Sequence, residues 1–330
     1  MLNRRYLRTK VMQSLYAYFQ SDDDRMDIAE KNLVKSIDKL YELYIHQLSI
    51  LFELVEFAKL RMEDSKLKYI PSEDDLNPNT RFIENRLVNQ IANNKRFILQ
   101  YNELKINWAD EQDIFRSIYQ KLKETKAYID YMNAETSSYN ADKKIILQLF
   151  RKFIISDEKL QNYFEDKNIY WADDYQTVAM MVLKTLDGFT EDKDDFYELP
   201  GLYKAEDRTN ANDDRNFIKE LFRKTIINNQ KFEKLIAEST TNWEVERIAV
   251  IDNILLKMAL VELTEFPSIP VKVTLNEYIE ISKGFSSDKS KVFINGILDK
   301  IITDFKGNKV MNKAGRGLFE KNKQSIQNEK

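Results

Sequence analysis

The stretch from Met26 to Lys66 contains neither glycine nor proline, and its apolar side chains recur every three or four positions. Such spacing lays a single apolar stripe along one face of a helix. The stripe is formed by Leu33, Ile37, Leu40, Tyr44, Leu48, Leu51, Val55, Ala58 and Met62. At a rise of 1.5 Å per residue this helix would be on the order of 60 Å long, which exceeds the size of a compact small domain.

The rest of the chain is also poor in residues that interrupt helices. Only seven glycines and five prolines occur in 330 residues, whereas an all-β fold needs many turns. Hydrophobic residues make up 43% of the chain, enough to bury a sizeable core. No apolar run approaches the ~20 residues of a membrane span, and the first helix lacks the features of a signal peptide. We therefore expect an all-α, soluble and cytoplasmic protein with no membrane contact.

The long stripe predicts one arm of a helical hairpin. Pro71 and Pro78 bracket a polar linker, after which Thr80–Trp108 predicts a second helix and Asp110 can cap a third. A coiled-coil seam explains this apolar stripe better than a ligand site does. Shorter helices are expected from about residue 140 onward.

Three further amphipathic helices are expected between Trp243 and Phe305. The first ends before a short connection, Thr264–Val273, which contains Pro267 and Pro270. Thr274 and Glu277 have the spacing of a capping box, which predicts that the second helix begins there. We expect Gly284 to end this helix in a left-handed conformation.

Positive charge gathers at both ends of a chain whose formal net charge is −3. The first ten residues hold four cations and no acid, and the tail after Phe305 is also basic. Arginines at a helix start oppose the helix dipole, at a cost of ~0.3–1 kcal/mol each when exposed. They are either phosphate contacts or a solvated basic end, and composition does not decide between these alternatives.

Residues for catalysis are scarce. His46 is the only histidine, and it lies in the long apolar helix, where a structural role is expected. The absence of cysteine excludes disulfides, thiolate zinc sites and cysteine nucleophiles. There is no GxxxxGK[ST] or GxGxxG phosphate loop. We expect no enzyme activity, no cofactor and no metal site.

Many residues of the last helical block carry a resemblance at fixed spacings. They are Trp243, Arg247-Ile248, Ile251-Asp252, Leu255, Ala259, Glu262-Leu263, Ile269-Pro270, Asn276-Glu277, Lys283-Gly284-Phe285, Ser290 and Phe293 to Asp299. Together with Arg4, Arg5, Arg8, Gln13, Leu15 and Tyr16 near the start, this block resembles the NusB family of transcription antitermination factors.

The resemblance implies a NusB-like helical bundle extended by an inserted long helical hairpin. Residues 1–20 would form its basic first helix, residues 21–139 the insertion, residues 140–305 the remaining bundle, and residues 306–330 a basic disordered tail. It implies a non-catalytic RNA-binding factor that holds boxA-type single-stranded RNA together with the ribosomal protein NusE. Such a factor would assist rRNA transcription by the transcribing RNA polymerase complex.

The resemblance also implies site residues. Those expected to contact RNA are Arg4, Arg5, Arg8, Lys272, Lys289, Lys291 and Phe293; those expected to contact the protein partner are Tyr16, Glu246 and Asp252. Phe293 also falls on the apolar stripe with Ile297, so a core position is an equal alternative. Lys289 stands where other members often carry an acid, and Tyr6 replaces an arginine of the usual basic run.

Two other functions compete with RNA-dependent antitermination. The chain is alternatively a helical scaffold that acts through its inserted hairpin. Less favoured is a domain associated with an RNA methyltransferase, because no nucleotide-binding glycine loop occurs. Gly296, inside a predicted helix, indicates the close approach of another helix, since glycine there costs ~1 kcal/mol relative to alanine.

Overall fold

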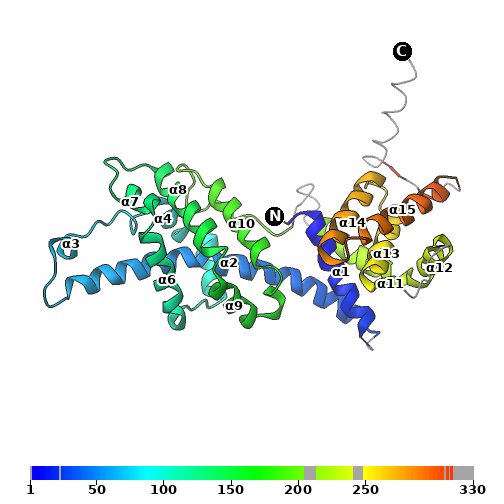
Figure 1. The fold of residues 1–330 in the computed structure, drawn as a ribbon, viewed down its shortest axis with the longest axis horizontal. Coiled ribbons are helices and arrows are strands. Elements are labelled where there is room, and N and C mark those ends of the chain that lie inside the picture. Colours follow the sequence, from blue (N-terminus) through cyan, green and yellow to red (C-terminus); the bar gives the residue numbers. More distant parts are fainter. Residues whose placement is uncertain are drawn as a thin grey trace, which may run out of the picture. The chain divides into compact units, whose positions relative to one another are not determined.

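The computed structural model describes residues 2–21, 24–203, 213–240, 248–307, 310–311 and 313–314. Within these ranges the regular structure is helical and contains no strand, which confirms the all-α expectation (Figure 1). No helix of the described ranges is long and apolar enough to cross a membrane.

The chain divides into two compact units. Residues 38–202 form the middle unit, and residues 2–37 together with 203–330 form the terminal unit. The middle unit has 22 basic and 30 acidic residues, whereas the terminal unit has 29 basic and 24 acidic residues. Their formal net charges are therefore −8 and +5.

The middle unit is built on the long helix α2 (Met26–Lys66), whose first twelve residues belong to the terminal unit. The other helices of the middle unit are α3 (Glu73–Leu76), α4 (Arg86–Ala92), α5 (Lys95–Glu103), α6 (Gln112–Lys123), α7 (Lys126–Met132), α8 (Tyr139–Leu149), α9 (Glu158–Lys167) and α10 (Tyr175–Gly188). Short 3₁₀ helices occur at Ala109–Glu111 and Ile169–Trp171, and a π-helical turn occurs at Phe150–Ile154.

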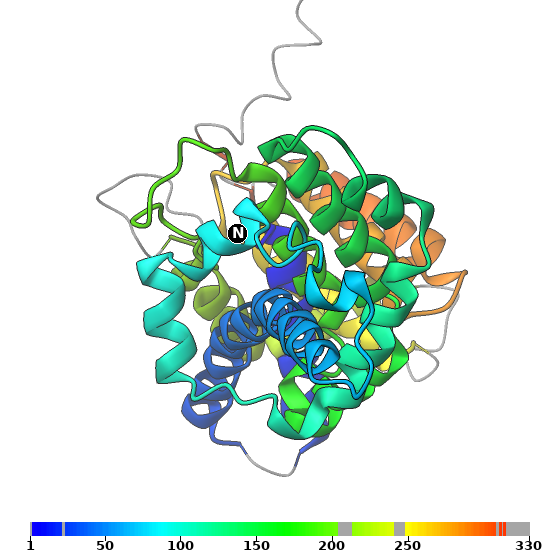
Figure 2. The ribbon, with the colours of Figure 1, turned by 90° about the vertical axis from the view of Figure 1, so that its left-hand side faces the viewer.

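The predicted stripe of α2 is buried along almost its whole length. All of its members are in the core except Met62, which is partly exposed. Figure 2 shows α2 nearly end-on with other helices of the middle unit around it. Hydrogen bonds support this arrangement: Tyr44 donates to Thr185 at 3.0 Å, and Trp108 donates to Ser49 at 2.9 Å. From Leu40 to Ala58 the stripe is thus buried within the middle unit.

The return arm of the hairpin differs from expectation. The range 80–108 holds two helices, α4 and α5, because the side chain of Asn94 accepts a hydrogen bond from the Phe97 amide and starts a new helix. Helix α8 packs on α4 and α7, and α10 packs on α8. The compact units divide at residues 37 and 202.

His46 occupies the interior of the middle unit. Its Nδ1 lies 2.8 Å from the Glu42 carbonyl, and its ring contacts those of Phe164 and Trp171. Burial lowers the pKa of His46 to about 4, so the ring is neutral near pH 7.

The terminal unit is a bundle around α13. Its helices are α1 (Arg4–Gln20), the start of α2, α11 (Asp213–Ile227), α12 (Asn229–Ser239), α13 (Val250–Glu265), α14 (Val271–Phe285) and α15 (Ser290–Gly307). Helix α13 packs against α1, α11, α12, α14 and α15. Every residue from Ile254 to Leu263 is consequently buried. The expected start of this helix at Trp243 lies outside the described residues.

Two local predictions for α14 are wrong. The helix begins at Val271 with Pro270 as its N-cap, three residues before the predicted capping box. The Thr274 hydroxyl instead donates to the buried Glu262 carboxylate at 2.8 Å, and this tertiary contact replaces the cap. Gly284 lies within the helix, without a left-handed conformation, and α14 continues to Phe285.

Candidate nucleic-acid interface

Helix α1 carries the expected arginines in its first turns. Asn3 starts the helix, because its side chain accepts a hydrogen bond from the Tyr6 amide at 2.8 Å. The apolar side chains Leu7, Val11 and Leu15 are fully buried. This packing turns Arg8 toward the interior and leaves Arg4 and Arg5 nearer the surface.

Arg8 is part of the core. Only 2% of its side chain is exposed, and its Nε and Nη2 lie 2.7 Å and 2.8 Å from the two carboxylate oxygens of Glu262. Burial opposes the positive charge, but the attraction and hydrogen bonding of Glu262 outweigh it and raise the pKa of Arg8. Both side chains of the pair are buried, so a phosphate would have to displace Glu262 to reach Arg8.

Glu262 joins three helices through this pair. Besides Arg8 on α1, it accepts hydrogen bonds from Thr274 and from the Tyr278 hydroxyl on α14, the latter at 3.3 Å. A buried ion pair of this kind needs such extra hydrogen bonds to offset the loss of hydration. The cluster fixes α1 against α13 and α14.

Arg4 and Arg5 are also engaged by carboxylates. Arg4 Nε lies 3.0 Å from Asp214 on α11, and Arg5 Nη2 lies 2.9 Å from Glu277 on α14. These two arginines, with Arg8 and the three acids, form what we call the arginine network. Arg5 remains 45% exposed, so the network has an accessible outer part and a buried inner part.

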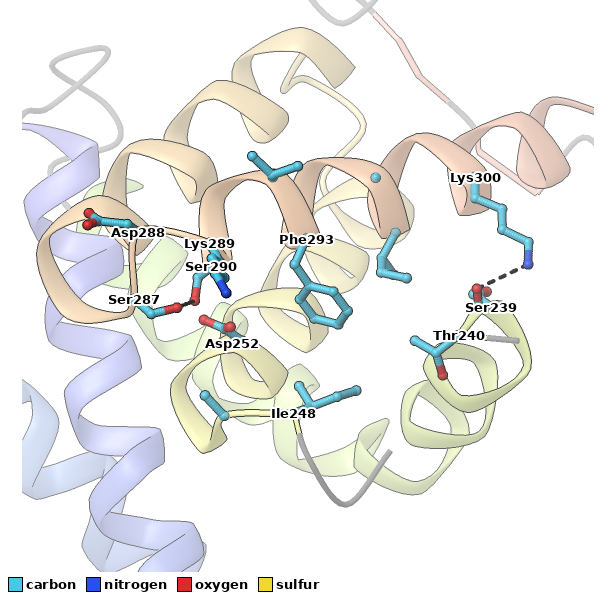
Figure 3. Close-up of a pocket in the computed structure, with 14 residues that line it drawn as sticks. Ser239, Thr240, Ile248, Asp252, Ser287, Asp288, Lys289, Ser290, Phe293 and Lys300 are labelled. Atoms are coloured by element: carbon cyan, nitrogen blue, oxygen red, sulfur yellow. Dashed lines mark hydrogen bonds between the residues drawn. The ribbon is translucent and has the colours of Figure 1, made fainter. Parts of the chain in front are cut away.

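A cavity of about 770 Å³ lies at the other end of the bundle. It is bounded by the end of α12, the start of α13 and the start of α15, and we call it the α15 pocket (Figure 3). Two cations that line it, Lys289 and Lys300, are both exposed. Lys300 Nζ donates to the Ser239 carbonyl at 3.0 Å, which holds the side chain along the rim.

Phe293 projects from α15 into this pocket (Figure 3). Its side chain is partly exposed, so the alternative of a fully buried core position does not apply. Near it the hydroxyls of Ser287 and Ser290 lie 2.9 Å apart at the start of the helix. The lining also contains two aspartates, Asp252 and the exposed Asp288. An aromatic face with cations close by suits a flat base whose phosphates lie toward the lysines.

Asp252 lines the same pocket from the first turn of α13. It is only 5% exposed, and among the described residues its Oδ1 has no hydrogen-bond partner. The structure thus brings Asp252, expected among the partner contacts, together with Lys289 and Phe293, expected among the RNA contacts.

The remaining expected residues lie apart from the pocket lining. Lys272 on α14 and Lys291 on α15 are exposed, and Tyr16 on α1 is also exposed. Glu246 lies outside the described residues.

Lys300 and Gly296 line the pocket but were not expected there. The spacing contained a signal for Lys300, which follows Phe293 by seven positions and therefore shares its helix face. For Gly296 the expectation of a close helix neighbour is wrong: a Cβ atom at this position would meet nothing within 4 Å. The glycine borders open space.

The fold and these two clusters define an all-helical protein whose terminal unit has a pocket lined by an aromatic ring and by charged side chains of both signs. A model described as the NusB family matches residues 174–303. The chain is 42% identical over 105 residues to the transcription antitermination protein NusB of Salinibacter ruber, a match that covers 32% of this chain and 66% of the relative. It therefore belongs to the NusB family.

Two further relatives carry the same name. The protein of Chloroherpeton thalassium is 41% identical over 106 residues, covering 32% of this chain and 50% of the relative. The protein of Natranaerobius thermophilus is 35% identical over 100 residues, a match that covers 30% of this chain and 71% of the relative. The chain thus spans between about half and 71% of the length of these relatives. No solved structure matches the chain.

Proposed function

We propose that this protein is a non-catalytic, RNA-binding transcription antitermination factor. In this proposal it binds boxA-type single-stranded RNA together with the ribosomal protein NusE and assists rRNA transcription within the transcribing polymerase complex. The observation that carries the proposal is the α15 pocket, where Phe293 and two exposed lysines lie inside the segment matched by the family model.

The chemistry of the pocket suits single-stranded RNA. A base that stacks on an aromatic ring contributes ~1–3 kcal/mol, while neighbouring lysines attract the phosphates that flank it. The terminal unit has a formal net charge of +5, whereas the middle unit has −8. A polyanion is therefore attracted to the terminal unit in preference to the middle unit.

The proposal assigns different roles to the expected residues. Phe293 and Lys289 hold RNA in the pocket, and the exposed Lys272 and Lys291 extend the contact. Arg4 and Arg5 reach phosphate only by exchanging their carboxylate partners. Arg8 takes no part, because it is enclosed with Glu262.

For the protein partner, we retain Tyr16 and Glu246 as proposed contacts. Tyr16 is exposed on α1, as a contact residue must be. Asp252, which lines the α15 pocket, is retained as a third proposed contact.

The test is a fluorescence-anisotropy titration of a labelled boxA-like RNA with the full-length protein. It is performed with and without the cognate NusE-type protein, at two salt concentrations, with a scrambled RNA as control. We expect binding that weakens with salt, because cations displace counterions from phosphate, and that tightens when NusE is present. Absence of binding by demonstrably folded protein, in both conditions, would refute the proposal.

One observation favours a second role as an interaction scaffold. Beyond the end of α2, Leu67, Tyr69 and Ile70 are almost completely exposed, with Tyr69 at 100%. Apolar side chains grouped in this way mark protein contacts, and the charge of the middle unit suits a basic protein surface. The triple variant Leu67→Ser/Tyr69→Ser/Ile70→Ser tests this role: it should bind RNA normally but associate more weakly with the polymerase complex. Unchanged association would show that this surface does not contact the polymerase complex.

A further inference from the structure

One region of the middle unit is rich in positive charge, although the unit as a whole is acidic. The stretches 121–124 and 144–159 hold six cations and three acids, whereas the whole unit has 22 basic and 30 acidic residues. The cations are all exposed, and we call them the π-turn patch: Lys121 and Lys123 at the end of α6, Lys144 on α8, Arg151 and Lys152 in the π-helical turn, and Lys159 in the first turn of α9. The acids are Glu124, Glu158 and the buried Asp157.

The segments that carry the patch meet at one junction. Helix α6 packs on the π-helical turn. Lys121 Nζ lies 3.6 Å from Oδ2 of Asp157, whose Oδ1 accepts a hydrogen bond from the Leu160 amide and so caps α9. Lys144 and Arg151 are seven residues apart, so they share a face of α8 and its continuation and lie about 10 Å apart along the axis.

The π-helical turn determines the direction of Lys152. In an uninterrupted α-helix this residue would share the face of Ile145 and Leu149, both of which are buried. The Ile155 amide instead donates to the Phe150 carbonyl, which adds one residue to the turn and rotates the side chains that follow. Lys152 is consequently exposed. Such turns are rare and often occur at functional sites.

Four cations of the patch have no carboxylate partner. Lys144, Arg151, Lys152 and Lys159 form no ion pair with any residue that the structure describes, although acids outnumber bases in this unit. The cations of the arginine network, by contrast, would have to exchange a carboxylate for a phosphate. An external anion can reach the π-turn patch without displacing an internal contact.

The side chains of the patch favour one kind of anion. Neither stretch presents a fully exposed aromatic ring, because Phe150 is buried and Phe153 is only partly exposed. Single strands are held by stacking on such rings, whereas an RNA duplex keeps its bases stacked inside and is contacted through its phosphates and its shape. Arginine binds phosphate through two parallel hydrogen bonds, and lysine binds it as a point charge.

We propose that the π-turn patch is a second RNA-binding surface, which holds the phosphate backbone of double-helical RNA without reading its sequence. Without these nine residues the middle unit has 16 basic and 27 acidic residues, so RNA that approaches the unit elsewhere is repelled. The choice of RNA among polyanions rests on the proposed function, which brings a transcript to this protein. The α15 pocket takes an unstacked base, so the two surfaces bind different parts of that transcript.

The experiment uses a fluorescently labelled, blunt RNA duplex of about 16 base pairs, a length that double-stranded-RNA-binding domains span. Full-length protein is titrated into it at several salt concentrations, and anisotropy is recorded. A second duplex of scrambled sequence and a boxA-like single strand are titrated in parallel.

Two matched triple variants are compared with wild type. The patch variant is Lys144→Gln/Arg151→Gln/Lys152→Gln. The control variant, Lys66→Gln/Arg96→Gln/Lys184→Gln, also removes two lysines and one arginine, all exposed elsewhere in the middle unit. Circular dichroism checks that both variants fold.

The patch variant should lower the slope of log affinity against log salt by about 3, at about 1 for each phosphate contact, and weaken duplex binding at least roughly tenfold at low salt. The control variant should lower the slope by less than about 1, and the two duplexes should bind wild type alike. Phe293→Ala should weaken binding of the single strand only. If the patch variant does not fold, Arg151→Gln alone should lower the slope by about 1.

The outcomes separate this inference from the proposed function. An equal loss of slope in the control variant would mean that binding follows overall charge, and the inference would be wrong. If folded wild type binds the single strand but no duplex, the inference fails and the proposed function stands; the reverse result supports the inference and refutes the proposed function. Poly-glutamate that binds in place of the duplex, and is lost in the patch variant, would identify an acidic protein as the partner and overturn the assignment to RNA.

Discussion

The arginine network and the α15 pocket lie in the same terminal unit, and each contains residues that the resemblance assigns to RNA binding. Their cations differ in whether a carboxylate of the protein pairs with them. In the network each arginine meets a carboxylate of its own bundle, at 3.0 Å for Arg4, 2.9 Å for Arg5 and 2.7 Å for Arg8. In the pocket Lys289 and Lys300 are exposed beside a cavity. Cation density along a sequence therefore does not measure how much positive charge a surface offers to a ligand.

The largest effect should come from the inner part of the network. Arg8→Ala leaves the Glu262 carboxylate buried without its cation, which should lower the free energy of unfolding of the terminal unit by ~3–5 kcal/mol. Urea unfolding followed by circular dichroism measures this loss, and hydrogen exchange of α13 assigns it to the terminal unit. The matched control is Arg5→Ala, where loss of an exposed pair should cost at most ~1 kcal/mol. An Arg8→Ala protein as stable as wild type but unable to bind RNA would reverse our assignment.

The next largest effect belongs to the pocket and concerns binding. Phe293→Ala removes the stacking surface and should weaken RNA binding by roughly 5- to 150-fold, equivalent to ~1–3 kcal/mol. Its effect on unfolding should stay below the ~3–5 kcal/mol of a core phenylalanine, because Phe293 is partly exposed. Anisotropy and thermal unfolding separate the two quantities. Phe285→Ala is the control, an exposed aromatic residue outside the pocket lining; an equal loss of affinity there would argue against stacking in the pocket.

A smaller difference should appear in the salt dependence of RNA binding. Each phosphate contact to single-stranded RNA contributes about 0.7 to the slope of log affinity against log salt. Lys289→Ala should reduce the slope by about this amount, whereas the double variant Arg4→Ala/Arg5→Ala should reduce it less, because these arginines already have carboxylate partners. Titrations at several salt concentrations provide the slopes. A larger change in the double variant would mean that RNA displaces the carboxylates.

The smallest effect is expected at Gly296 and should separate stability from binding. Gly296→Ala should raise the free energy of unfolding by ~0.5–1 kcal/mol, since alanine favours the helix and no atom opposes its Cβ. The same methyl group occupies space in the pocket, so RNA affinity should fall modestly, about two- to fivefold if it costs ~0.5–1 kcal/mol. Thermal unfolding and RNA titration of one preparation test both. A gain in stability with unchanged affinity would exclude Gly296 from the ligand space.

Periodicity predicted the helices well because burial of a stripe is a local, repetitive property. The members of the α2 stripe other than Met62 are in the core, and α13, α14 and α15 exist where their apolar spacing indicated them. Periodicity did not predict where the helices begin and end. Thr274 had the local pattern of a cap, but a carboxylate twelve residues earlier in the chain took its hydroxyl.

The candidate site was less predictable because its residues depend on contacts between distant segments. Arg8 looked like a surface cation because its partner, Glu262, is 254 positions away. The resemblance named Phe293 and Lys289 but not their geometry, and it grouped Asp252 with a different partner. The unsatisfied oxygen of Asp252 and the space beside Gly296 are properties of the folded pocket alone.

The long sequence separation between α1 and the helices that pack on it also affects how the protein folds during synthesis. At ~5–20 residues per second, ribosomes need roughly 10–50 s to add the 254 residues from Arg8 to Glu262. Throughout that interval the apolar face of α1, with Leu7, Val11 and Leu15, lacks the bundle that later buries it. All residues of the middle unit, by contrast, are synthesised in one uninterrupted run before α11. The nascent chain therefore carries an unfinished first helix past a completed unit, which makes that helix a natural substrate for ribosome-associated chaperones.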